Sequence, residues 1–207
     1  EYGMCTLITA NRSFESLVGV TAHELAHSWF QFVLATNESK HEWMDEGFTE
    51  YYCTQAEASI MGVDEERVFK SAYNRYRKLA LSGLEQPQTT HADRFKFNAS
   101  YGVSAYTKGS IFLRQLKHII GAIAFDKAMK NYFSLWSFKH PTPNDFIRCA
   151  EKSSGAELDW YLTDWTMTTN TIDYAVDSVT EAGDMVKVKL KRIGLMPTPI
   201  EVEVLYE

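Results

Sequence analysis

The residues best suited to chemistry in this sequence are two histidines and a glutamate in the segment 20–30. His23 and His27 are four positions apart, and on an α-helix that spacing stacks two side chains on one face, one turn apart. Two imidazoles placed in this way can both bind one metal ion. Glu24 directly follows the first histidine and can reach the open side of the metal, where a water would sit. This His-Glu-x-x-His arrangement is typical of zinc hydrolases.

A catalytic zinc ion usually has three protein ligands and one water, so the motif predicts a third ligand elsewhere. The next acidic cluster lies in the segment 43–51, where Glu46 stands 46 − 27 = 19 positions after His27. A second helix there could cross the first and supply a carboxylate. The alternative is a surface helix whose His and Glu side chains face water, and the five-residue motif alone leaves it open. The Trp-Met-Asp-Glu-Gly-Phe context of Glu46 favours the metal site.

Several segments together carry a resemblance to a known family. The His-Glu-x-x-His helix, eighteen intervening residues and Glu46 in its Trp-x-Asp-Glu-Gly-Phe context resemble the gluzincin zinc metallopeptidases of the aminopeptidase N family. The resemblance implies a mainly α (α+β) fold, in which a mostly helical, thermolysin-like catalytic domain is followed by β-strands from a C-terminal β-sandwich. Further matching segments extend it over most of the chain: 105–109 (Tyr-x-Lys-Gly), 138–143 and 159–165.

These residues predict a hydrolytic mechanism. We expect one Zn²⁺ per chain, bound by His23, His27 and Glu46, with a water in the fourth position. Glu24 would take a proton from that water and pass it to the leaving amine, as general base and then general acid. The oxyanion that forms needs a second donor. The residues alone leave the choice among 11 tyrosines open, and the resemblance assigns this role to Tyr106.

A second carboxylate on the same predicted helix suggests support for the metal ligands. Glu50 lies four residues after Glu46, on the same helix face. Metal-bound histidines usually donate their other ring N–H to a carboxylate or carbonyl. Glu50 is therefore a candidate for orienting one histidine, and the alternative is a solvated acid.

The resemblance also assigns a role to the first residue. In the family, a Gly-x-Met-Glu-Asn segment on a strand before the zinc helix supplies an anion for the free amine of the substrate. Glu1 stands at the corresponding place, so the resemblance implies that Glu1 binds the substrate amine. The sequence departs from the pattern at Tyr2, where the family has Asn, and the preceding Gly-x-Met lies outside it.

Composition limits the class of protein. The 207 residues, 45% of them hydrophobic, suffice for one large domain or for one domain plus part of another. A net charge of −6 without a basic patch argues against nucleic acid as a partner. The spacing of Cys5, Cys53 and Cys149 suits neither a disulfide framework nor a zinc ribbon. No apolar run approaches a membrane span. Without an initiator Met or a targeting segment, the sequence reads as a soluble piece of a longer protein whose compartment is unknown, bacterial cytoplasm and periplasm both being open.

Hydrophobic periodicity places secondary-structure elements around these motifs. Apolar residues go most of the way round the segment 13–34, which predicts a buried helix whose polar groups need a partner such as a metal. Gly62 predicts the end of a helix, and Asp64 and Thr142 predict helix starts. The expected elements are a strand at 4–9, helices at 13–34, 45–61, 64–82, 101–120, 124–138, 142–154 and 158–165, and a loop at 84–100 that is long enough to shape a site.

The pattern changes after residue 171. Apolar residues alternate with lysines at 186–190 and with glutamates at 200–204, and a period of two predicts strands. If these two strands pair antiparallel through the connection at 194–199, their lysines and glutamates share the exposed face. The predicted organisation is a thermolysin-like catalytic domain at 1–172 and a β-strand segment at 173–207 that begins a C-terminal β-sandwich.

These features lead to a ranking of functions. The first is a zinc metallopeptidase, an aminopeptidase that removes N-terminal residues from peptides by means of a zinc-activated water. One alternative is a zinc endopeptidase or other zinc hydrolase with the same chemistry. Another is a non-catalytic interaction module on the same fold, which the intact His23, Glu24, His27 and Glu46 disfavour. The expected partners are peptide substrates and the missing domains of the parent chain, with no nucleic acid.

Overall fold

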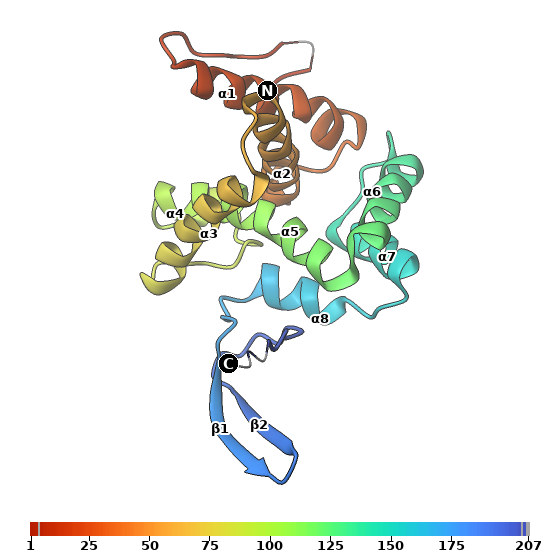
Figure 1. The fold of residues 1–207 in the computed structure, drawn as a ribbon. Coiled ribbons are helices and arrows are strands. Elements are labelled where there is room, and N and C mark those ends of the chain that lie inside the picture. Colours follow the sequence, from red (N-terminus) through yellow and green to blue (C-terminus); the bar gives the residue numbers. More distant parts are fainter. Residues whose placement is uncertain (4, 204, 206–207) are drawn as a thin grey trace. The chain divides into compact units, whose positions relative to one another are not determined.

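A computed structural model of the chain describes residues 1–3, 5–203 and 205 and divides into two compact units, Glu1–Thr169 and Asn170–Glu207. The first unit is helical (Figure 1). It also contains all the candidate metal ligands found among the described residues. The second holds a two-stranded sheet. The predicted mainly helical fold with additional strands is therefore confirmed.

The helical unit consists of α-helices joined by short segments of π- and 3-10 helix. None of its described helices is long and apolar enough to cross a membrane. In chain order the elements are α1 (Phe14–His27), the π-helix η1 (Ser28–Val33), α2 (Glu42–Met61), α3 (Glu65–Leu81), the 3-10 helix η2 (Ala92–Arg94), α4 (Asn98–Gly102), the π-helix η3 (Val103–Lys108), α5 (Gly109–Ile120), α6 (Ala122–Trp136), α7 (Pro143–Ser154), α8 (Asp159–Leu162) and the π-helix η4 (Thr163–Met167).

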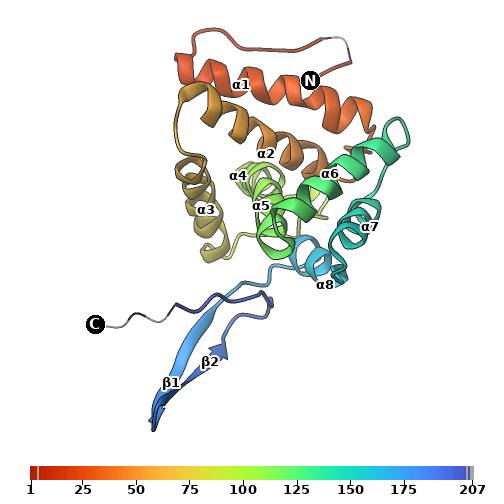
Figure 2. The ribbon, with the colours of Figure 1, turned by 45° about the vertical axis from the view of Figure 1, so that its right-hand side comes forward.

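Helix α2 lies at the centre of this unit, between α1 and α5 (Figure 2). Most of its residues from Glu42 to Cys53 are buried. Two of its aromatic rings pack against rings from other helices: Trp43 lies 5.1 Å from Phe112 and Phe48 lies 4.8 Å from Phe146, measured between ring centroids. Because α2 is fixed on several sides by aromatic packing, a side chain that it presents to α1 has a well-defined position.

Two glycines allow α2 and α5 to approach closely. A Cβ atom on Gly47 would lie 2.5 Å from Gly109 Cα, and one on Gly109 would lie 2.7 Å from Gly47 Cα. Any larger residue at either position would force the two backbones apart. These glycines directly follow Glu46 and the π-helix η3, so the close approach determines how near η3 comes to Glu46.

Several helix ends agree with the sequence prediction. Gly62 ends α2 in the left-handed conformation, at φ 63°. The Asp64 carboxylate accepts a hydrogen bond from the backbone N–H of Glu66 at 3.0 Å, at the start of α3. Before α7, the Asp145 carboxylate accepts from the backbone N–H of Thr142 at 2.9 Å and from its hydroxyl at 2.6 Å.

The strand predicted at 4–9 is wrong for the residues that the structure describes there. Residues 5–9 form no strand, and Tyr2 and Cys5 make only an isolated bridge. Met4 lies outside the described residues. A strand needs a neighbouring strand to satisfy its backbone N–H and C=O groups, and no described segment pairs with residues 6–9.

The predicted helix at 13–34 is present as α1 and η1, but its burial was predicted wrongly. Only Ala26 and His27 of α1 are fully buried, whereas Leu17, Leu25 and Trp29 are 43%, 56% and 51% exposed. These three side chains line a groove of about 920 Å³ between α1, α2 and α6. Helix α1 has apolar residues on both faces, but only one face packs on α2. The other face is open, so α1 is only partly buried.

The second unit is a β-hairpin in which only one of the two predicted strands takes part. The predicted strand at 186–190 is present as β2 (Met185–Arg192), but its antiparallel partner is β1 (Tyr174–Ala182). Residues 200–203 form no strand, and Val204 lies outside the described residues. Gly183, at φ 61°, allows the tight turn that joins the two strands. A bulge between Val176 and Ser178 breaks the alternation of β1, which explains why the pattern was not recognised.

Candidate metal centre

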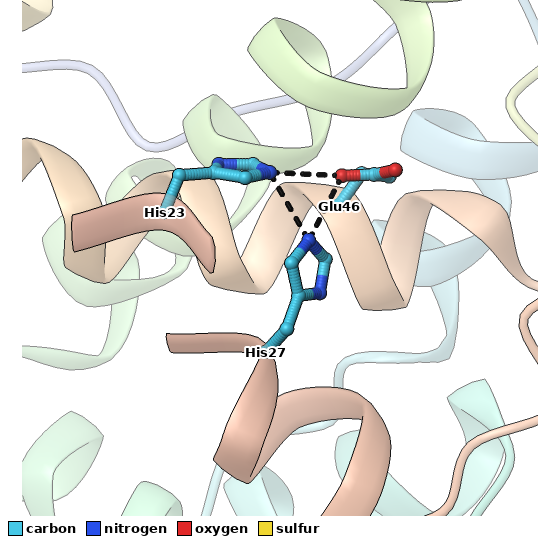
Figure 3. Close-up of side chains that lie close together, drawn as sticks. All are labelled: His23, His27 and Glu46. Atoms are coloured by element: carbon cyan, nitrogen blue, oxygen red, sulfur yellow. Dashed lines mark hydrogen bonds and ion pairs between the residues drawn. The ribbon is translucent and has the colours of Figure 1, made fainter. Parts of the chain in front are cut away.

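Three ligand atoms converge at the interface of α1 and α2 (Figure 3). Helix α1 supplies His23 and His27, and α2 supplies Glu46. The two Nε2 atoms lie 3.1 Å apart, and the Glu46 Oε2 atom lies 3.1 Å from His23 Nε2 and 3.4 Å from His27 Nε2. The structure thus brings together the three residues that the sequence predicts as metal ligands.

The spacing of these atoms fits a tetrahedral metal ion. With bonds of about 2.0–2.2 Å to nitrogen and oxygen, neighbouring corners of a tetrahedron lie about 3.3–3.6 Å apart. The three observed separations are within a few tenths of an ångström of that range. Two imidazoles and one carboxylate are also the ligand types that zinc takes in catalytic sites. The donor set therefore fits Zn²⁺ in both geometry and chemistry.

The Nδ1 atoms of both histidines point towards carboxylates of α2. His27 Nδ1 lies 2.8 Å from Asp45 Oδ1, and the Thr49 hydroxyl is 3.3 Å from the same nitrogen. His23 Nδ1 lies 3.2 Å from Glu50 Oε2. A carboxylate that accepts from Nδ1–H leaves the Nε2 lone pair free for a metal. Each imidazole is thus turned so that Nε2 faces the shared centre.

Tyr106 of η3 also reaches the same centre. Its hydroxyl donates a hydrogen bond to Glu46 Oε1 at 2.6 Å. Its ring stacks on that of His23, with centroids 5.6 Å apart and planes inclined by 16°. Among the tyrosines, the one selected by the family resemblance is therefore in contact with two of the candidate ligands.

Glu24 and Glu1 face each other beside the ligands. The backbone nitrogen of Glu1 lies 3.2 Å from Glu24 Oε2, and the Glu1 carboxylate makes an ion pair with His27 Nε2. The Glu24 side chain is 15% exposed. Glu1 thus lies next to the shared centre, and Glu24 lies next to Glu1. The predicted role of Glu1 in binding a substrate amine stays a prediction, because here its carboxylate contacts His27.

Comparison with known proteins agrees with this geometry. Residues 5–165 match the peptidase family M1 domain. The chain belongs to peptidase family M1. Among curated relatives of this M1 chain, aminopeptidase N of Caulobacter vibrioides is 29% identical over 154 residues, and aminopeptidase M1 of Arabidopsis thaliana is 26% identical over 153 residues. These alignments cover 72% and 71% of the M1 chain, but only 18% and 17% of the two relatives.

A solved structure shows the same fold. An M1 zinc metallopeptidase of Deinococcus radiodurans, determined as an E323A mutant bound to a Tyr-Ser-Ala substrate, superposes with a TM-score of 0.58 at 23% sequence identity. The superposition covers 72% of the M1 chain and 32% of the solved chain. The M1 chain therefore spans a minor part of the relatives that it matches.

The charges of the ligands in the M1 chain depend on one another. Burial lowers the pKa of His23, but hydrogen bonds with Cys53, Glu46 and Glu50 outweigh it and raise the pKa to about 12. For His27, burial is likewise outweighed by Asp45, Glu1 and Glu46, and its pKa rises to about 11. Without a metal, both imidazoles are held as cations by the surrounding carboxylates.

The pKa values of the Glu46 and Asp45 carboxylates shift in opposite directions. Burial raises the pKa of Glu46, but hydrogen bonds from His23, His27 and Tyr106 outweigh it and lower the pKa to about 2. Burial raises the pKa of Asp45 to about 7, although the hydrogen bond with His27 opposes it. Glu46 therefore remains an anion, as a metal ligand must, while the charge of Asp45 depends on pH near neutrality.

Sequence reasoning missed Asp45 and Thr49 as partners of His27. Both are buried, at 2% and 0% exposure. They lie four residues apart on α2 and therefore share one face of the helix. The signal in the sequence was the Asp-Glu pair at 45–46 within an otherwise apolar context, because a buried acid needs a partner.

Proposed function

We propose that this M1 chain is the catalytic core of a zinc-dependent aminopeptidase that removes N-terminal residues from peptides. The observation that carries the proposal is the convergence of His23 Nε2, His27 Nε2 and Glu46 Oε2 at tetrahedral spacing. His23, His27 and Glu46 would hold one Zn²⁺. When bound, the zinc ion would polarise the scissile carbonyl and make a water more acidic. The names of the relatives favour an aminopeptidase over an endopeptidase or an interaction module.

Each remaining residue has a proposed role that its position supports. Glu24 takes a proton from the attacking water as general base and then donates it to the leaving amine as general acid. The Tyr106 hydroxyl, which already lies at the edge of the centre, donates a hydrogen bond to the carbonyl oxygen as negative charge develops there. Asp45 and Glu50 orient the two imidazoles.

Exopeptidase action requires recognition of a free amine, and the proposal assigns this to Glu1. Its carboxylate lies beside His27 and its backbone faces Glu24, so it borders the position of the scissile bond. An anion at that point would pair with a substrate ammonium group and exclude peptides with a blocked N-terminus.

The test measures zinc content and hydrolysis in the same protein. The unaltered chain, loaded with zinc, should cleave a peptide with a free amine and leave the same peptide untouched when its amine is acetylated. Glu24→Ala should retain one zinc ion and lose hydrolysis by about 100-fold or more, since general acid–base catalysis contributes on that scale. Glu15→Ala, which removes an exposed carboxylate from the first turn of the same helix, serves as the matched control and should change neither. Full turnover by Glu24→Ala would refute the mechanism, and equal cleavage of the blocked peptide would refute the exopeptidase assignment.

A further inference from the structure

A buried ion pair lies on the far side of η3 from the metal centre. Lys108 Nζ is 2.7 Å from Glu85 Oε1, and the two side chains are only 1% and 4% exposed. The Lys108 ammonium group also lies 5.4 Å from the ring centroid of Tyr76 on α3 and 5.9 Å from that of Trp165 on η4. Helix α3, the loop that follows it and η4 therefore all meet around one lysine of η3.

Such a pair adds little to stability compared with apolar packing. Removing two charges from water costs several kcal/mol for each ion, and their attraction roughly offsets that cost only when the geometry is good. Burial accordingly lowers the pKa of Lys108, and Glu85 opposes the shift. What the pair does provide is a fixed arrangement, because a buried lysine displaced from its one carboxylate would be left uncompensated.

Lys108 of this pair is close to Tyr106 in the sequence, but its side chain faces away from that of Tyr106. Lys108 follows Tyr106 by two positions in η3, so the two side chains leave the helix from nearly opposite sides. A second buried link acts on the same segment, since Gln88 Nε2 donates to Ser104 O at 2.8 Å. Glu85 and Gln88 both belong to the loop between α3 and η2. Ala92 N–H ties the end of this loop to Glu42 Oε1 of α2, at 3.0 Å.

The segment η3 that carries Tyr106 is π-helical. A π-turn is rare, and such turns frequently occur at functional sites. Here the turn directs the Tyr106 hydroxyl to Glu46. The Gly47–Gly109 approach fixes the end of η3 against α2, and the loop fixes its other side.

We propose that Glu85 and Lys108 are positioning residues for Tyr106, holding η3 so that the tyrosine hydroxyl reaches the metal centre. The inference rests on the proposed function, because it gives Tyr106 a part in catalysis. Neither Glu85 nor Lys108 touches the substrate. Their effect passes through the backbone of η3, and Gln88 adds a weaker, uncharged contribution.

The direct test follows the Tyr106 hydroxyl by magnetic resonance in protein with isotope-labelled tyrosine. The Tyr106 signal is assigned by its loss in Tyr106→Phe. Lys108→Met/Glu85→Gln removes both charges at nearly constant side-chain size, and it should shift this signal as the hydrogen bond to Glu46 loosens. Lys108→Arg, which keeps the charge, should shift it less. Arg114→Met is the matched control, since it breaks an ion pair of 2.9 Å between α5 and Glu65 of α3, and it should leave the signal in place.

An unchanged Tyr106 signal in the folded double variant would overturn the inference. Should that variant fail to fold, Glu85→Asp keeps both charges but shortens the acid by one methylene, which disturbs the 2.7 Å contact with Lys108. It should move the signal in the same direction by a smaller amount, and no movement there would again overturn the inference.

Kinetics separate this inference from the proposed function. Tyr106→Phe should lower kcat about 100-fold, as loss of one oxyanion donor does. Lys108→Met/Glu85→Gln should lower kcat about tenfold with little change in KM, because small displacements of catalytic groups are costly. In the Tyr106→Phe background the same double variant should lower kcat no further. A tenfold loss of kcat in both backgrounds would show that the double variant does not act through Tyr106, and it would refute the inference. A Tyr106→Phe enzyme with full activity would refute the role of Tyr106, while the spectrum would still report whether the pair holds its hydroxyl.

Discussion

The two imidazoles of the metal centre come from one helix but have different surroundings. His27 is fully buried, and its Nδ1 partners, Asp45 and Thr49, are buried with it. The His23 side chain is 13% exposed, and its partner Glu50 is 24% exposed and lies 4.0 Å from Arg75. One ligand is thus anchored in the interior between α1 and α2, and the other lies at its edge, beside Tyr106.

This difference in burial indicates which side of the metal centre is the more rigid. A hydrogen bond to a carboxylate is strong when water cannot compete for either partner, and its loss leaves a buried group unsatisfied. The same bond at a partly exposed position can be replaced by water and is screened by salt. The buried His27 side should therefore fix the position of the metal, and the His23 side should adjust to it.

The largest expected effect concerns both imidazoles together. Each has a pKa raised far above 6.5, so near neutral pH each carries a proton that zinc must displace. Zinc affinity should therefore rise with pH, by about tenfold per unit for each proton and about 100-fold for two. Competition with a chelator between about pH 6 and pH 8 measures this slope. In His23→Ala only one proton has to be displaced, so the logarithm of the zinc affinity should rise half as steeply with pH. A zinc affinity that does not change with pH would contradict the raised pKa values of the two histidines.

The stability of the metal-free chain should change with pH in the opposite direction to its zinc affinity. Both folded-state pKa values are raised, so the folded protein holds more protons than the unfolded chain above about pH 6.5. This contribution to stability is complete below that pH and is lost as pH rises towards 11–12. Thermal unfolding of the zinc-free chain at increasing pH should show a falling midpoint over the range in which zinc affinity rises.

The second largest expected effect concerns the carboxylate that supports His27, the buried histidine. Asp45→Asn keeps an acceptor for His27 Nδ1–H but removes the negative charge from a position that water cannot reach. Loss of such a partner typically lowers metal affinity about 10–100-fold, and we expect the upper part of that range here. Chelator competition at one constant pH, chosen above the Asp45 pKa of about 7 so that this carboxylate is charged, measures the loss. Asp126→Asn, at an exposed site on α6, is the control, and an unchanged affinity in Asp45→Asn would contradict the anchoring role of His27.

The two supporting acids also show what the sequence could predict. Glu50 was found because a spacing of four from Glu46 places it on the same helix face, and local periodicity is enough to show that. Asp45 was missed because it lies next to Glu46 and leaves the helix in another direction. Whether that direction meets His27 depends on how α2 crosses α1, which is a property of tertiary packing.

The same distinction applies to the fold. Gly62, Asp64 and Thr142 determine helix ends through their own backbone and side-chain chemistry, and these predictions were confirmed. The strands predicted at 4–9 and 200–204 depend on partners elsewhere in the chain, and the described residues of both segments form no strand. The Glu85–Lys108 pair was also out of reach, since its members lie 23 positions apart and no local pattern joins them.

The smallest expected effect is that of Glu50→Gln. The amide still accepts from His23 Nδ1–H, and Glu50 is exposed enough for water to replace part of the lost interaction. Zinc affinity should fall by about tenfold or less, the lower end of the range for such partners, and by less than in Asp45→Asn. Because surface charges are screened, the loss should shrink further in high salt, whereas the Asp45→Asn loss should not. Equal losses in the two variants, or a larger loss in Glu50→Gln, would show that burial does not decide which histidine anchors the metal.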